Sequence, residues 1–125
     1  MKQKIETADA PKPSGTYSQA IKAGNTIYLA GQIPLDITSG NLVSDDFKQQ
    51  AIQVFTHLQT VCKAAKGNLA AVVRLTVYLT DLKQFPIVNE VMSQFFTEPY
   101  PARTTIEVSA LPKGSQIEID AIMVV

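Results

Sequence analysis

The sequence predicts an α+β fold, with two helices on one face of a mixed, mostly antiparallel sheet and the element order β-β-α-β-α-β-β. Two segments carry apolar residues at helical spacing, and several short segments alternate between apolar and polar residues. Turns rich in glycine and proline separate these segments. No linker, repeat or low-complexity stretch divides the chain, so we expect residues 1–125 to form a single domain.

The first part of the chain is predicted to be a loop followed by a β-hairpin. Residues 8–16 (ADAPKPSGT) are rich in proline, glycine and small side chains, which is typical of a loop. Residues 17–34 contain two apolar runs on either side of the turn dipeptide Gly24-Asn25. A second turn is predicted at residues 36–43 (DITSGNLV), where the chain turns toward the first helix.

The first helix is predicted to begin after residues 44–46 (SDD), any of which can cap its N-terminus. Apolar residues recur at helical spacing from Phe47 to Ala65, and we expect Gly67 to end the helix. His57 falls on the polar side and is predicted to be solvated. Cys62 falls on the apolar stripe and is predicted to be a core residue.

The second half of the chain is predicted to contain three strands and one helix. Residues 72–80 (VVRLTVYLT) alternate, which predicts a strand whose apolar face carries Val73, Leu75, Val77 and Leu79. The next helix has Pro86 in its first turn and ends before residues 98–101 (EPYP). Residues 103–110 and 116–124 are predicted to pair as a hairpin closed by LPKG.

Two helices can cover only one face of such a sheet. The second face is predicted to carry Thr76, Tyr78, Ile122 and Val124, a set that is too apolar to face water as one patch. We therefore expect a homo-oligomer that buries these faces together.

The composition argues against several classes of function. Eleven basic and eleven acidic residues are dispersed without any basic stripe, so we expect no binding of nucleic acid or of an anionic membrane. No apolar stretch approaches the length of a membrane span, and a single cysteine fits a reducing compartment, so a cytoplasmic location is expected. One histidine and one cysteine argue against a metal site. The sequence contains no phosphate-binding loop, so no nucleotide cofactor is expected.

The predicted last hairpin places Arg103, Thr105 and Asp120 on one sheet face, with Thr105 opposite Asp120 and Arg103 diagonal to it. Such a group could hold a substrate carboxylate on the arginine and orient a water with the aspartate. The same spacing fits a cross-strand ion pair that fastens the C-terminus, and spacing alone favours this simpler interpretation.

Four segments together resemble the RidA branch of the Rid family, the reactive intermediate deaminases. They are APKPSGTYSQA at 10–20, IYLAGQIP at 27–34, VVRLTVYLTDLKQFPIVNEV at 72–91 and YPARTTIEVSALPKGSQIEIDAI at 100–122. The resemblance implies a chorismate-mutase-like fold and a homotrimer with active sites in clefts between subunits. It also implies cofactor-free hydrolysis of 2-imino acids, the products of PLP-dependent serine and threonine dehydratases, to 2-keto acids and ammonium.

The resemblance further implies roles for individual residues. Arg103 matches the arginine that binds the substrate carboxylate, Asp120 aligns with a glutamate that positions the attacking water, and Tyr17 matches a tyrosine that lines the cleft. The other expected substrate-binding positions are Ala30, Gly31, Asn89 and Thr105.

Two other functions are compatible with such a chain. One is a trimeric protein that binds 2-keto or other short carboxylic acids in the same clefts and regulates without catalysis. The other is an endoribonuclease or translation inhibitor, against which the absence of a basic stripe argues.

Overall fold

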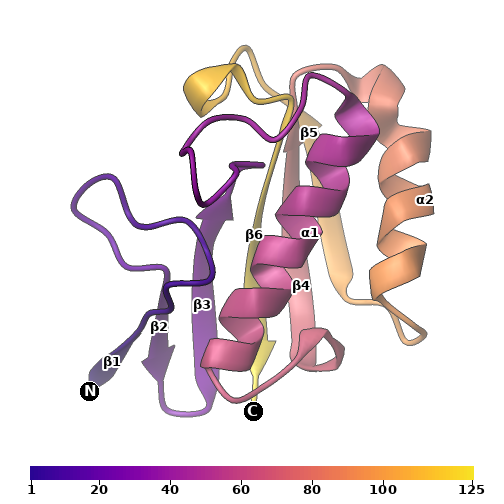
Figure 1. The fold of residues 1–125 in the computed structure, drawn as a ribbon. Helices are drawn as coiled ribbons and strands as arrows, with labels where there is room; N and C mark the ends of the chain where they lie inside the picture. The colour runs from indigo at the N-terminus through magenta and orange to yellow at the C-terminus, as the bar shows by residue number, and fades with distance from the viewer.

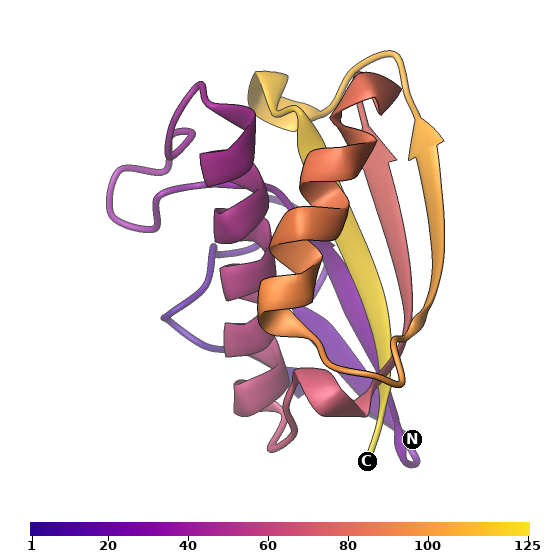
Figure 2. The ribbon, with the colours of Figure 1, turned by 90° about the vertical axis from the view of Figure 1, so that its right-hand side faces the viewer.

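The computed structural model describes residues 1–125 as two layers, a six-stranded sheet and two helices that both pack on one of its faces (Figures 1 and 2). The helices are α1 (Phe47–Ala64) and α2 (Phe85–Phe95). The strands are β1 (Lys2–Ile5), β2 (Ala20–Ala23), β3 (Thr26–Gln32), β4 (Val72–Leu79), β5 (Ala102–Glu107) and β6 (Ile117–Val124). The predicted α+β class and the placement of both helices are confirmed, while β1 was not predicted.

The sheet order is β1-β2-β3-β6-β4-β5, and only the β4–β5 pair is parallel. The hairpin at residues 20–32 is confirmed. The predicted pairing of the last two strands is wrong, because β4 lies between β5 and β6. Helix α2 is the crossover between β4 and β5, and a crossover helix joins parallel strands.

This topology separates two residues that the hairpin would have placed on one face. Arg103 is in register with Leu75 on β4, whereas Asp120 is in register with the next residue, Thr76. Consecutive residues of a strand point to opposite faces. Arg103 therefore lies on the helical face of the sheet and Asp120 on the open face, which rules out the predicted ion pair between them.

The apolar face of β4 also differs from the prediction at one residue. The register with β6 shifts between Val72 and Arg74, which places Val72 in the core and leaves Val73 48% exposed. The shift is a β-bulge, an irregularity that adds a residue to one strand and reverses the alternation locally. Leu75, Val77 and Leu79 are buried as predicted.

The core consists of 25 buried apolar residues between the helices and the sheet. Phe55 of α1 is stacked on Phe95 of α2, with ring centroids 5.5 Å apart, and meets Phe96 edge-on. Cys62 belongs to this core, as predicted, and burial raises the pKa of its thiol to about 11.

The two ends of α1 are fixed by different residue types. The Asp46 side chain caps the N-terminus by accepting from the Gln49 amide. At the C-terminus Lys66 takes the left-handed conformation, with φ 64°, and the Gly67 amide donates to the Cys62 carbonyl. Gly67 thus takes part in ending the helix, but Lys66 provides the left-handed turn.

His57 is buried, which contradicts its predicted exposure. Its Nε2 lies 2.7 Å from the carbonyl of Leu35, which also accepts from the Gln53 amide. The segment after β3 covers this side of α1, a packing that the polar character of the helix face did not reveal. Burial lowers the pKa of His57, so the ring is neutral at pH 7 and donates from Nε2.

The face of the sheet away from the helices is uncovered (Figure 2). It carries Thr76 and Tyr78 of β4 and Ile122 and Val124 of β6, as predicted. Tyr28 of β3, which pairs with Ile122, is 51% exposed on the same face. No helix in the structure is long and apolar enough to cross a membrane.

Candidate active site

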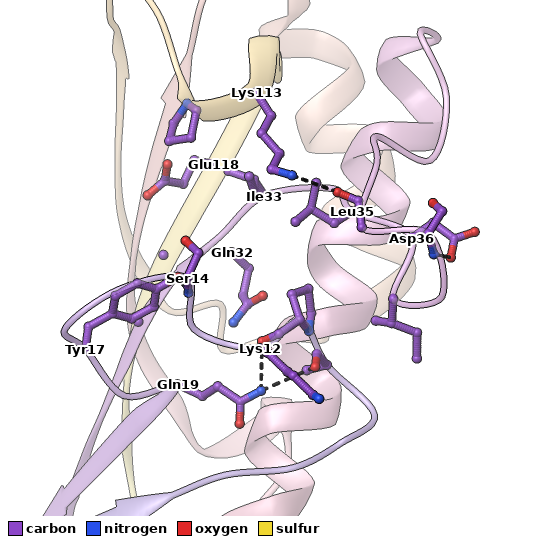
Figure 3. Close-up of a pocket in the computed structure, with 18 of the residues that line it drawn as sticks. Lys12, Ser14, Tyr17, Gln19, Gln32, Ile33, Leu35, Asp36, Lys113 and Glu118 are labelled. Atoms are coloured by element: carbon purple, nitrogen blue, oxygen red, sulfur yellow. Dashed lines mark hydrogen bonds between the residues drawn. The ribbon is translucent and has the colours of Figure 1, made fainter.

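A cavity of about 740 Å³ lies between the loop before β2, the end of β3 and the segment after it (Figure 3). Three predicted site residues line it: Tyr17, Ala30 and Gly31. Ala30 and Gly31 sit in a bulge, because the β3–β6 register shifts between Leu29 and Gln32.

Gln19 fixes the loop that carries Tyr17. Its buried side chain accepts from the Thr7 amide at 2.7 Å and donates to the Pro11 carbonyl at 2.9 Å. The Tyr17 hydroxyl accepts from the Ser14 amide at 3.2 Å, and the tyrosine remains 53% exposed. The loop thus presents an exposed aromatic ring at the cavity.

Glu118 of β6 lines the same cavity (Figure 3) and lies beside Gly31 of the bulge. A Cβ added at Gly31 would overlap the Glu118 carboxylate and lie 2.9 Å from its Cδ. Glycine at position 31 therefore makes the room in which this carboxylate sits. Burial, and then the charge of Asp120, raise the pKa of Glu118, which has neither a salt bridge nor a hydrogen bond within the subunit.

Asp120 lines neither of the two main cavities. Its Oδ2 accepts from the Tyr78 hydroxyl at 2.9 Å on the open face of the sheet. That hydrogen bond, together with burial, raises the pKa of Tyr78. The expected role of Asp120 in positioning water stays a prediction, while Glu118 is the β6 carboxylate that reaches the cavity.

Arg103 and Asn89 line a second cavity of about 440 Å³ between α2 and β5. The Arg103 Nη1 donates to the Asn89 Oδ1 at 2.8 Å and lies 3.4 Å from the Met92 sulfur. The guanidinium carbon is 5.0 Å from the centre of the Phe85 ring. No carboxylate forms a salt bridge with Arg103, and its other N–H groups make no hydrogen bond within the subunit.

Thr105 lines neither cavity, and its hydroxyl is buried without a hydrogen-bond partner. Five of the seven predicted site residues thus fall into two separate groups, and Thr105 and Asp120 belong to neither. Tyr17, Ala30 and Gly31 stand with Glu118, and Arg103 stands with Asn89.

Glu118 is the site residue that sequence reasoning missed. Glu118 and Asp120 are two residues apart in the strand sequence IEID, so both carboxylates lie on one face. The alternation alone could not show which of them reaches the site. The pairing of β6 with the bulge of β3 distinguishes them, because the bulge and Glu118 meet at the same end of the two strands.

The family model described as Endoribonuclease L-PSP matches residues 7–125. The chain belongs to this family, the Rid proteins. The RutC family protein PH0854 of Pyrococcus horikoshii is 49% identical, over 98% of this chain and 97% of that protein. The 2-iminobutanoate/2-iminopropanoate deaminase of Homo sapiens is 44% identical, over 96% of this chain and 88% of its own.

Among solved structures, RidA from an Antarctic Psychrobacter superposes with a TM-score of 0.95 and 47% identity. The match covers 98% of this chain and 99% of that one. The resemblance to the RidA branch is therefore confirmed over nearly the whole length of the chain, and this Rid protein shares the fold of a RidA.

Proposed function

We propose that this Rid protein hydrolyses 2-imino acids to 2-keto acids and ammonium, in sites assembled between copies of the chain in a homotrimer. The observation that carries the proposal is the guanidinium of Arg103. It lines a cavity and can bind an anion, but no carboxylate of its own chain forms a salt bridge with it. The human relative named as an imine deaminase supports the reaction class.

The assembly is proposed because each subunit holds two half-sites. Glu118, Tyr17 and the β3 bulge lie around one cavity, and Arg103 lies at another on the edge strand β5. The uncovered sheet face carries exposed apolar side chains, such as Tyr28 and Val124. Burying this face against a second copy would remove an apolar patch from water and bring unlike half-sites of neighbouring copies together.

Arg103 is proposed to bind the substrate carboxylate. Its Nη1 is held by Asn89 and the plane of the group rests near the Phe85 ring, which fixes the direction of the remaining donors. A guanidinium can give two parallel hydrogen bonds to one carboxylate, and this geometry orients the imine carbon for attack.

Glu118 is proposed as the acid and base of the reaction. Its raised pKa favours a carboxylic acid that protonates the imine nitrogen and makes the imine carbon electrophilic. The resulting carboxylate accepts a proton from the water whose oxygen adds to that carbon. The proton then passes to the nitrogen and the C–N bond breaks. As ammonia leaves, the hydroxyl group returns its proton to the Glu118 carboxylate and the carbonyl forms, and the ammonia takes a proton from water to become ammonium.

Serine and threonine dehydratases that use PLP are the proposed source of the substrate. They release enamines, and these tautomerise to 2-imino acids that can damage other PLP enzymes. A hydrolase of this kind would clear the intermediates without a cofactor of its own.

The test is a trapping assay. An amino acid oxidase produces the imine from alanine, 2-aminobutyrate or leucine, and semicarbazide competes with the purified protein for it. We expect the wild-type protein to suppress semicarbazone formation and Arg103→Ala to lose that effect. Lys48→Ala is the matched control, since Lys48 pairs with Glu90 on the surface, away from both cavities.

Sedimentation of the wild-type protein and of both variants should show particles of three chain masses. A stable monomer would contradict the shared site. If the trimer binds 2-keto acids through Arg103 but hydrolyses no imine, the protein is a binding protein for short carboxylic acids and not an enzyme.

A further inference from the structure

Tyr78 and Asp120 form a hydrogen-bonded pair on the open sheet face, next to the carboxyl group of Glu118. Tyr78 of β4 is the direct cross-strand partner of Glu118 of β6. Its hydroxyl nevertheless reaches diagonally and donates to Asp120 Oδ2 at 2.9 Å. Asp120 follows Glu118 by two residues, so both carboxylates point to the same face of the strand.

We propose that Asp120 and Tyr78 are positioning residues for Glu118: the Asp120 charge favours the protonated form of the Glu118 carboxyl, and the hydrogen bond from Tyr78 offsets part of that charge. The inference rests on the function proposed above, in which Glu118 gives a proton to the imine. Neither Tyr78 nor Asp120 lines the cavity, so both act only through Glu118.

The surroundings of Glu118 single out Asp120 as its electrostatic partner. On β3 it meets Gly31, which carries no charge, and on β4 it meets the Tyr78 ring. The other titratable groups that line its cavity are Tyr17, Lys12, Asp36 and Lys113. The Lys113 ammonium donates to the Gly40 carbonyl, and none of these groups forms a salt bridge or hydrogen bond with Glu118.

The strength of the effect follows from spacing. Two residues along a strand span about 7 Å, and two unit charges at that distance in water shift a pKa by about 0.4 units. Partial burial of Glu118 weakens the screening by water, so the shift should be at least this large.

The experiment measures the Glu118 side-chain carboxyl directly, by 13C NMR titration of the full-length protein. Asp120→Asn removes the charge and keeps an oxygen that can accept from Tyr78. It should lower the Glu118 midpoint by about 0.4 pH units or more. Tyr78→Phe removes the donor that neutralises part of the Asp120 charge, and it should move the midpoint upward. Asp45→Asn, a surface change before α1, should leave it in place.

The pH dependence of imine hydrolysis is the second measurement. The proposed reaction needs the protonated form of Glu118. The part of the pH–rate profile that reports Glu118 should therefore shift in the same direction, and by the same amount, as the Glu118 titration midpoint. An unchanged Glu118 midpoint in Asp120→Asn would overturn the inference, as would shifts of the same sign in both variants. A midpoint that moves while the rate profile stays fixed would also overturn it.

These readouts separate the two proposals. If the wild-type protein hydrolyses no imine, the proposed function fails, and the titration still decides whether the pair controls the charge of Glu118. If the protein hydrolyses imines but the Glu118 titration midpoint is unchanged in Asp120→Asn, only the further inference fails.

Discussion

Replacing Gly31 by alanine tests whether the position of the Glu118 carboxylate limits catalysis. Gly31 does not have a positive φ, so alanine adds no backbone strain and acts only through its methyl group. That methyl carbon would lie 2.9 Å from the Glu118 Cδ and 3.2 Å from its Cγ, with the carboxylate oxygen closer still. The backbone of the β3 bulge is held by the sheet, so the glutamate side chain is the part that must move.

The size of the displacement sets the expected loss of activity. Ordinary carbon contacts begin near 3.5 Å, so Cδ must retreat by roughly 0.5 Å and the oxygen beyond it by about 1 Å. A misplacement of about 1 Å in a reacting group can lower a rate ~100-fold. We therefore expect kcat for imine hydrolysis to fall by about two orders of magnitude. Stability should change by less than about 1 kcal/mol, because Glu118 is only half-buried.

The semicarbazide assay measures the rate, and urea unfolding measures the stability. Gly24→Ala is the matched control, because Gly24 lies in the β2–β3 turn with φ +61° and no atom within 4 Å of the added Cβ. It should lower stability and leave kcat unchanged. Full activity in Gly31→Ala would refute the assignment of Glu118 to the reaction.

Three further predictions concern the core and its titratable groups. Gly67→Ala places a Cβ 2.8 Å from the buried Met123 sulfur and should lower the free energy of unfolding by about 1–3 kcal/mol, measured in urea. The folded pKa of His57 is lowered, so the unfolded chain binds more protons below its pKa of about 6.5, and stability should fall from pH 7 to pH 5. His57→Gln should flatten that decline; an identical slope in both proteins would exclude His57 as its source. Iodoacetamide at pH 8 should label Cys62 only in urea, since the thiol is buried with a pKa of about 11, and rapid labelling of the folded protein would contradict its burial.

The sequence predicted the elements of this fold better than their pairing. Helical spacing from Phe47 and alternation along β4 are local signals, and both correspond to observed elements. Which strands pair with β6 depends on contacts between residues far apart in the sequence. The short turn between β5 and β6 favoured a hairpin that the structure does not contain. Helix α2 takes β5 to the far side of β4, and no local feature of residues 103–124 reports that crossover.

The same limit explains the errors at single residues. Val73 is exposed because a bulge interrupts the alternation, and His57 is buried because a loop distant in sequence packs on α1. The site was predicted in part: Arg103 and Asn89 form a hydrogen bond, and Tyr17 and Gly31 line the same cavity. Glu118 required the register of β3 against β6, which places it at the bulge.

The hydrophobic core contains none of the residues assigned here to the reaction: the cluster between helices and sheet excludes Tyr17, Gly31, Asn89, Arg103 and Glu118. Mutations at these positions therefore leave the main source of folding free energy intact. Most random changes in proteins destabilise the fold, and selection removes those that take stability below the level that function needs. A lineage with this architecture can alter its substrate preference through the loops and the edge strand while its stability stays nearly constant, so new activities are accessible to it by single substitutions.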